Sequence, residues 1–492
     1  MSTVLISDLG RIAAIAWLIH PAFAQVSQMA RYEIQMGERN EARYTAAKLG
    51  EDGLMVYRRL VGKDNDVFEM IKLDTMLREN WKGNIPVSKK LDIIQTRSFV
   101  GALYVLLKDP TVVGKDFVII SINHLSSSFH SYPVKNIIPF YPTEFVITER
   151  AAMIGGYFNS RPLVLYYNFT QQSSRILPGF FNTPGELDQI KVNPDGTTDI
   201  VVSARNFQKR RALWIRTYDK EGELTKTTVL QPSDDRHLLF GRTLLLPDGR
   251  QLVAGIYGRF TEYSRGIFVS VVQPGGSYSL QYYNFADLKN FFSYMRARQQ
   301  KRVKDRIERR TIKGKRVKFN YRLLVHDLVQ HNNELLLIGE AFYPNYVYPR
   351  GYNPQARVER VFDGFKYTHA VVIGFEKDGK LSWDNSFEIN DVKTYTLQQF
   401  VRVQPEENRI LLMYLFDNVI RTKIIANDEV LEGKAQEKMR SGMDEDLDKE
   451  EENTEKMDAW YGKYFYAAGT QSLKGRRGGF RQVFFINKIT YR

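Results

Sequence analysis

The side chains from which a catalytic or metal site could be built are few in kind. The 492-residue chain contains seven histidines and no cysteine. No histidine lies in a His-x-His or His-Glu-x-x-His pattern, and His326 and His331, five residues apart, have neither a one-turn helical spacing nor an evident carboxylate partner. We therefore expect no catalytic zinc and no cofactor. The absence of cysteine also excludes disulfides and a thiol nucleophile.

Motifs for other chemistry are missing as well. The sequence contains no Gly-x-Ser-x-Gly elbow, phosphate-binding loop or dinucleotide fingerprint in a strand-turn-helix context, which argues against nucleotide enzymes. Residues 193–198 (NPDGTT) resemble the Asp-box turn of sialidases, but the turn occurs once and lacks the following tryptophan, so we interpret it as a hairpin. A pair of glycosidase carboxylates cannot be chosen from spacing alone. We name no catalytic residue.

Basic side chains are concentrated in one segment. Thirteen lysine and arginine residues lie between Lys289 and Lys318, against Asp305 and Glu308, so the segment holds +11 of the chain's net charge of +14. Apolar residues recur within it at steps of three and four, which predicts an amphipathic helix over about residues 287–310, with its apolar stripe on the rest of the protein. It is either a solvated element or a contact for an anionic partner. The candidate contact residues are Arg298, Arg302, Arg306, Arg309 and Arg310.

Aromatic side chains gather in a second segment, between about residues 342 and 354. Three prolines interrupt this segment, which predicts a stiff aromatic loop. Rigid amphipathic rings suit both protein contacts and sugar stacking, although such a loop could simply pack over the fold. The candidate contact residues are Phe342, Tyr343, Tyr346, Tyr348 and Tyr352.

Acidic side chains form a third unusual segment. Ten acids against four bases lie between Glu437 and Asp458, with few apolar residues among them. This composition predicts a mobile acidic loop over about residues 435–459, which either keeps the protein soluble or contacts a partner or cation.

The N-terminal residues indicate export. An apolar run of eight residues, 12–19, is followed by Ala22-Phe23-Ala24, which has the small-x-small form of a signal-peptidase site. We expect residues 1–24 to be a signal peptide and the mature chain to begin at Gln25. A buried N-terminal helix is the alternative. No other stretch is long enough to span a membrane, so the mature chain should carry no transmembrane helix.

The elements that must position these segments form a repeat. Pairs of apolar runs recur about eight times, and the first five pairs begin 47, 51, 47 and 52 residues apart, near the length of a four-stranded blade. The second runs begin at Val67, Asp116, Leu163, Ala212, Gly266, Ala370, Val419 and Phe480, and the first runs begin at Leu54, Gly101, Ala152, Asp199, Gln251, Leu335, Arg409 and Tyr464.

This spacing predicts an all-β fold, a β-propeller over residues 25–492, with seven blades as the preferred count and eight as the alternative. A β-sandwich would not repeat at fifty residues, and β-helix coils are shorter. The last pair lacks a convincing first strand. It either completes an earlier blade or shares a blade with residues 30–34, which would join the chain ends and remove an exposed edge. Asp-Gly pairs between the runs, such as Asp195-Gly196 and Asp248-Gly249, predict tight hairpins.

Two stretches resemble a known group of proteins. Residues 374–391 (GFEKDGKLSWDNSFEIND) and the closing strand FRQVFFINKITYR are similar to uncharacterised exported proteins of Bacteroidota that are predicted to be β-propellers. The resemblance covers mainly the C-terminal third and includes no catalytic motif. It implies an exported propeller in the periplasm or at the outer membrane, and it implies no activity.

Three functions remain open. The first is a non-enzymatic scaffold of the bacterial cell envelope that binds protein partners through loops on one face. The second is a carbohydrate-active or other hydrolytic propeller, which would need carboxylates and aromatic rings converging at the mouth of the ring. The third is a binder of an anionic polymer, glycan or lipid headgroup through the basic helix. Nucleic acid is not expected as a partner, because export removes the protein from it.

Overall fold

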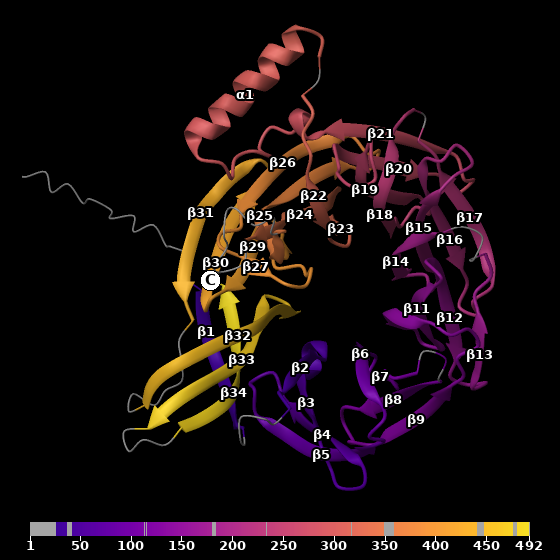
Figure 1. The fold of residues 1–492 in the computed structure, drawn as a ribbon, viewed down its shortest axis with the longest axis vertical. Coiled ribbons are helices and arrows are strands. Elements are labelled where there is room, and N and C mark those ends of the chain that lie inside the picture. Colours follow the sequence, from indigo (N-terminus) through magenta and orange to yellow (C-terminus); the bar gives the residue numbers. More distant parts are fainter. Residues whose placement is uncertain are drawn as a thin grey trace, which may run out of the picture.

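Eight antiparallel sheets form a ring around a central axis (Figure 1), so the protein is a β-propeller. This computed structural model describes residues 26–36, 42–112, 114, 116–179, 184–232, 234–315, 317–348, 359–439, 447–475 and 480–491. The predicted signal peptide and its cleavage site lie outside these residues. Within them, no helix is long and apolar enough to cross a membrane.

The first four blades follow one another along the chain, each built from four strands in sequence order. Blade one is β2 (Thr45–Lys48), β3 (Leu54–Leu60), β4 (Asp66–Leu73) and β5 (Glu79–Val87). Blade two is β6 (Asp92–Phe99), β7 (Ala102–Lys108), β8 (Phe117–Asn123) and β9 (Phe129–Val134). Blade three is β10 (Tyr141–Ile147), β11 (Ala151–Phe158), β12 (Arg161–Asn168) and β13 (Ser173–Ile176). Blade four is β14 (Gly185–Val192), β15 (Thr198–Arg205), β16 (Arg211–Tyr218) and β17 (Leu224–Leu230).

Blades five to seven continue the pattern, with additions in blade six. Blade five is β18 (His237–Leu245), β19 (Gln251–Gly258), β20 (Gly266–Val272) and β21 (Tyr278–Asn284). Blade six is β22 (Arg322–Val325), β24 (Glu334–Val347), β25 (Val361–Glu376) and β26 (Leu381–Glu388), joined by the short strands β23 (Val329–His331) and β27 (Lys393–Thr394). Blade seven is β28 (Arg402–Glu406), β29 (Arg409–Phe416), β30 (Val419–Ala426) and β31 (Glu429–Lys438).

The eighth blade combines the two ends of the chain. Its strands are β32 (Leu447–Tyr461), β33 (Tyr464–Gly475), β34 (Phe480–Tyr491) and, from the N-terminus, β1 (Val26–Gln35). β1 pairs antiparallel with β34 from Val26↔Tyr491 to Gln35↔Val483. The ring is therefore closed by hydrogen bonds between residues more than 440 positions apart, as the last repeat suggested.

The preferred count of seven blades is wrong, and the alternative of eight is confirmed. The eight apolar pairs found in the sequence are the second and third strands of the eight blades, which are the most deeply buried. The missing first strand of the last blade is β32. Its N-terminal half carries the acidic run, so the segment expected to be a loop over residues 435–459 consists largely of β31 and β32. The charged and polar residues of this strand, which are mostly acidic, hid it from a search for apolar runs.

Hydrophobic clusters between neighbouring blades hold the ring together. Where blade eight meets blade one, Phe484, Ile486 and Trp460 pack against Leu54 and Ile71. On its other side, blade eight packs against blade seven through a second buried cluster. Each Å² of apolar surface that is buried contributes roughly 25 cal/mol to the free energy of folding. Because these clusters lie between blades, each blade is stabilised by its two neighbours. Loss of the closing blade would expose both flanking clusters.

Glycine is required where backbones turn or approach closely. Gly196 and Gly249, which follow aspartate in two of the predicted hairpins, have φ of 85° and 79°, so these turns are confirmed. In β19, a Cβ on Gly255 would lie 2.0 Å from the carbonyl oxygen of Phe240 on the adjacent first strand. Gly255 therefore marks a close contact between the first and second strands of blade five.

The long insertions leave the ring on a single face. Because the four strands of a blade alternate in direction, the connection between the second and third strands and the connection to the next blade emerge on the same side. The basic segment links β21 to β22, the aromatic segment joins β24 to β25, and residues 439–446 link β31 to β32. We call this side the insertion face.

Ring closure can be tested by shortening the chain. Deleting residues 26–35 should lower the melting temperature by several degrees and promote aggregation, because the edge of β34 loses its partner strand and becomes available to other molecules. The matched control is a chain that begins at residue 26, measured by the same thermal scan and light scattering. Equal melting of the two chains would show that β1 contributes nothing to closure.

Candidate functional site

The basic insertion is anchored to the ring before its helix begins. The helix α1 spans Ala297–Ile312, so the prediction of a helix from about residue 287 is wrong at its start. A 3-10 turn, η2 (Phe285–Asp287), comes first. The Asp384 carboxylate on β26 then accepts hydrogen bonds from the backbone N–H groups of Lys289 and Asn290, both at 2.8 Å. These bonds direct the chain into turns instead of a helix.

An aromatic cluster completes this anchor. Phe285 stacks on Phe291 with ring centroids 4.5 Å apart, and Tyr321, from the returning end of the insertion, lies 4.9 Å from Phe291. His369 on β25 is fully buried beneath them and stacks on Tyr294 at 3.9 Å. The insertion therefore begins and ends on one rigid platform of blades five and six.

The helix itself lies outside the rim of the ring (Figure 1) and has no fully buried residue. Val303 and Ile307 are half-buried against the cluster of blades five and six, so the expected apolar stripe contacts the propeller only in part. The rest of the helix surface is cationic and open to solvent. The five arginines singled out in the sequence are all exposed, and none forms an ion pair with a described residue: Arg298, Arg302, Arg306 and Arg309 lie away from the apolar stripe, and Arg310 lies on the side of Val303 and Ile307.

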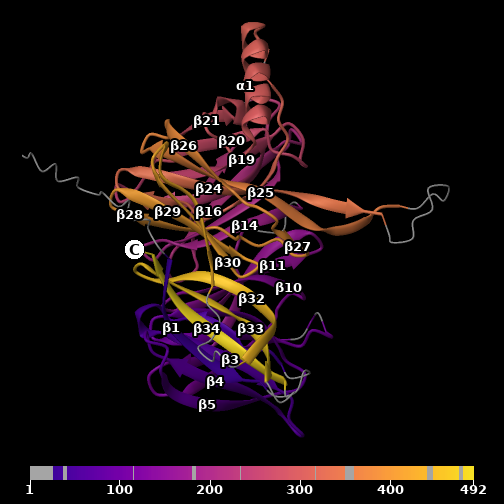
Figure 2. The same cartoon turned by 90° about the vertical axis from the view of Figure 1, so that its left-hand side faces the viewer.

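The aromatic segment is a β-ribbon, and the prediction of a loop is wrong for its described part. β24 and β25 remain paired past the edge of blade six to Val347↔Val361, and Figure 2 shows them projecting beyond the ring. Bulges after Ala341 and Pro344 accommodate the proline. Tyr352 lies outside the described residues. We call residues 342–348 and 359–366 the aromatic ribbon.

Ring contacts and one ion pair stiffen the aromatic ribbon. Phe362 lies between Tyr346 and Phe365, with centroid distances of 5.8 and 5.0 Å, and Phe342 contacts Phe365 from the opposite strand at 5.7 Å. At the base, Lys393 on β27 pairs with Asp363 at 3.0 Å. The outer tyrosines remain exposed: Tyr343, Tyr346 and Tyr348 are 43%, 51% and 47% exposed, and Arg360 lies over the ring of Tyr348, 5.1 Å from its centroid.

Polar side chains on the wall of the central channel join blades that are not neighbours. Gln189 of blade four donates to Asp327 of blade six at 3.0 Å, and Arg242 of blade five lies 3.6 Å from the same carboxylate. Burial raises the pKa of Glu144 in blade three, against the opposing effect of Arg242 and Arg97. Blades three and five are not neighbours, and neither are blades four and six. These side chains therefore interact through the channel.

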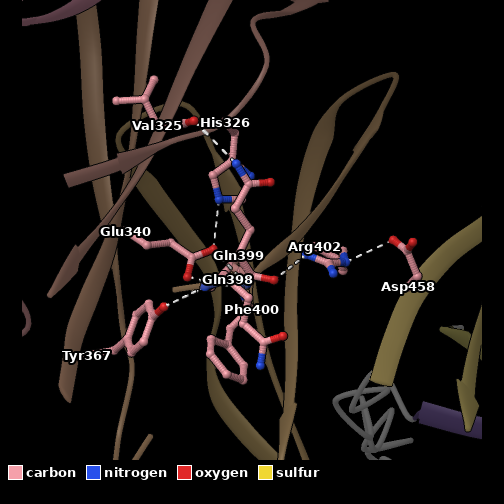
Figure 3. Close-up of polar contacts among 10 residues, drawn as sticks. Val325, His326, Glu340, Tyr367, Gln398, Gln399, Phe400, Arg402 and Asp458 are labelled. Atoms are coloured by element: carbon pink, nitrogen blue, oxygen red, sulfur yellow. Dashed lines mark hydrogen bonds and ion pairs between the residues drawn. The ribbon is translucent and has the colours of Figure 1, made fainter. Parts of the chain in front are cut away.

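A second polar group links blades six, seven and eight (Figure 3). The carboxylate of Glu340 on β24, which is fully buried, accepts hydrogen bonds from the backbone N–H groups of Phe400 and Val401, at 3.0 and 2.9 Å. His326 Nε2 lies 2.7 Å from Oε1 of the same carboxylate. Arg402, just beyond, pairs with Asp458 of blade eight at 2.9 Å. Sequence reasoning found no carboxylate partner for His326, because Glu340 lies on a different strand.

The contacts of the His326–Glu340 pair hold segments of the chain in place, and we call the pair the Glu340–His326 clamp. Glu340 uses both carboxylate oxygens to hold the chain that enters blade seven, and none of the hydrogen bonds of His326 in the described residues goes to a hydroxyl that could act as a nucleophile. Within the part of the chain that the structure describes, no three histidine or acidic side chains are arranged to hold a metal ion.

Comparisons with known proteins give this chain neither a family nor a function. The sequence matches no protein-family model and no curated protein. Solved structures that match in part include the polysaccharide lyase Uly1 (10% identity, 80% of this chain and 89% of that chain, TM-score 0.39). An acylaminoacyl peptidase from Pyrococcus horikoshii (10%, 78% and 50%, TM-score 0.38) and prolyl oligopeptidase B from Galerina marginata (8%, 89% and 56%, TM-score 0.40) also match. Similarity this weak carries no information on activity.

The buried His369 beneath the basic insertion should make stability depend on pH. Burial lowers its pKa to about 3, whereas an unfolded histidine titrates near about 6.5. Between these values only the unfolded chain binds the proton, so folding stability should fall as pH drops, by up to about 1.4 kcal/mol per pH unit. Replacing His369→Phe should flatten this dependence, measured by urea unfolding between pH 4.5 and 7.

A matched control is the exposed His130, whose replacement by phenylalanine should leave the wild-type pH dependence in place. Asp188, whose pKa burial raises to about 8, acts in the opposite direction, since its folded form retains a proton that the unfolded chain loses above about pH 4. It is present in all three proteins, so it cancels in the comparison. Parallel curves for His369→Phe and wild type would contradict the assignment.

Proposed function

We propose that the protein is a non-enzymatic scaffold of a bacterial cell envelope that holds a protein partner on the insertion face of its propeller. The observation that carries this proposal is the aromatic ribbon, which projects beyond the ring (Figure 2) and carries the exposed tyrosines Tyr343 and Tyr346. Tyrosine is enriched at protein interfaces because it supplies a large contact area at low cost in conformational entropy.

The construction of the aromatic ribbon supports binding over simple coverage. A loop that packed over the propeller would bury its apolar side chains. Tyr343, Tyr346 and Val361 instead remain 43%, 51% and 55% exposed. Two-stranded ribbons are marginally stable in water, and here Asp363 and β27 brace the base. A braced ribbon loses little freedom on binding, so the contact area is converted more fully into affinity.

The envelope location rests on the N-terminal sequence pattern and on the resemblance to exported proteins of Bacteroidota. Both support a proposal that the protein works in the periplasm or at the outer membrane. If the apolar run is a signal peptide, N-terminal sequencing of protein purified from its native cells should begin at Gln25. A first residue of Met1 or Ser2 would overturn the location.

The aromatic ribbon can be tested directly. Replacing Tyr343, Tyr346 and Phe362 by serine should abolish recovery of the partner after gentle crosslinking in membranes, because the exposed rings are lost while the ring of blades is untouched. The melting temperature should change little, since the ribbon projects beyond the blade. Quantitative mass spectrometry of crosslinked complexes from wild type and variant would measure the loss.

A control removes apolar surface from the opposite face. Val430 and Leu431 begin the outer strand of blade seven and are 50% and 56% exposed, away from the insertion face. Serine at both positions should leave the crosslinked partner in place. Equal losses in the two variants, or none in the ribbon variant, would contradict the proposal.

Hydrolysis is the second candidate function, and the His326–Glu340 pair is the observation that favours it. A histidine oriented by a buried carboxylate can act as a general base. Here, however, the pair would need to release its hold on the chain around Phe400 or receive a nucleophile from the substrate side. The geometry therefore supports scaffolding better than hydrolysis.

A further inference from the structure

A cleft at the foot of the basic insertion has the features of an anion site. It has a volume of about 680 Å³ and lies between three connections of the insertion face: residues 231–236, residues 259–265 and the returning end of the insertion. Six cations line it, namely Arg236, Arg259, Arg265, Arg310, Lys315 and Lys318. Only Arg310 belongs to the helical residues that the sequence singled out.

The acids in the cleft balance only two of these cations. Asp234 lies 3.3 Å from Arg236, and Asp235 lies 3.6 Å from Arg259. The side chains of the remaining four, Arg265, Arg310, Lys315 and Lys318, form no ion pair or hydrogen bond with another described residue. Four uncompensated positive charges around one hollow repel one another, and a bound anion would relieve that repulsion.

The walls of the cleft are fixed before any ligand arrives. Ser264 and Tyr321 exchange backbone hydrogen bonds of 2.8 and 3.2 Å, which tie the returning end of the insertion to the β19–β20 connection. Val317, between the lining lysines, is buried. Arg236 lies flat over Tyr282, 4.1 Å from the ring centroid. A cationic cleft on such a frame is preorganised, so little order has to be imposed on binding.

The carboxyl end of α1 is the one opposing feature, because carbonyl groups there repel anions. One of these carbonyl groups, that of Arg310, already accepts hydrogen bonds from the backbone N–H groups of Lys313 and Lys315, at 3.1 and 2.9 Å. The side chains of the same residues then present positive charge beyond the helix end. The local field is therefore dominated by the cations.

We infer that this cleft binds an anionic chain through sulfate or phosphate groups, with Arg265, Arg310, Lys315 and Lys318 as the contacts. Guanidinium groups bind such oxyanions with paired, charge-assisted hydrogen bonds, and lysines add point charges. The volume exceeds that of one inorganic ion and falls within the range of ligand sites. This inference does not depend on the aromatic ribbon or on a protein partner.

The test compares two triple variants of the full chain that remove the same charge. R265Q/K315Q/K318Q removes three positive charges from the cleft, whereas R298Q/R302Q/R306Q removes three exposed arginines along the helix. Titration calorimetry with a sulfated dextran oligosaccharide should show binding to wild type. Affinity should be at least about tenfold weaker for the cleft variant, since charged hydrogen bonds are lost, and almost unchanged for the helix variant.

Three further probes define the chemistry. Unsulfated dextran should not bind, tripolyphosphate should compete with the sulfated chain, and inorganic phosphate should bind far more weakly than either. Melting temperatures of both variants should stay near wild type, which excludes unfolding as the cause. Equal weakening in the two variants would show diffuse attraction by the whole insertion, and binding of unsulfated dextran or none of the sulfated chain would overturn the inference.

Discussion

The rest of the structure depends on the pairing of β1 with β34. The ring is closed only when its last blade has all four strands, and here the completing strand comes from the other end of the chain. That pairing places blade eight between blades one and seven, so that Trp460, Phe484 and Ile486 bury themselves against blade one. Without it, two interblade clusters would face water and the outer edge of β34 would be unpaired.

Closure also decides where binding can occur. In a closed ring of alternating strands, connections of any length leave on one of two faces, and the three long ones leave on the same face. On the wall of the central channel, polar contacts join blades that are not adjacent to each other, such as Gln189 with Asp327. The ring is therefore a rigid support, and its distinctive chemistry lies in the aromatic ribbon and the cationic cleft at the insertion face.

Much of this fold could be read from the sequence, and the parts that could not share a physical cause. Second and third strands are buried on both faces and read as continuous apolar runs, so all eight pairs were recognised. First strands border the axis and carry polar residues, and the acidic run of β32 is therefore typical of a loop when only its sequence is considered. The helix start was misplaced because Asp384, almost a hundred residues away, captures the chain at Lys289.

The candidate sites were harder to foresee than the fold. Clusters of arginines and tyrosines are visible in the sequence, and the structure leaves both exposed, the arginines on a helix outside the rim (Figure 1) and the tyrosines on the aromatic ribbon (Figure 2). The cleft, by contrast, brings Arg236, Arg265 and Lys318 together from three connections, and the Glu340–His326 clamp joins different strands. Such sites depend on long-range packing, which no local pattern in the sequence records.

Hydrogen exchange at the closing strand tests the central claim most directly. If β1 completes the ring, the amides of Val26–Gln35 that pair with β34 should exchange as slowly as those of β33, because they are exposed only when the whole ring opens. Mass spectrometry of deuterium uptake in peptides from β1 and β33 provides the comparison. Exchange of the β1 amides within seconds, while β33 remains protected, would show that the ring is open and contradict the account.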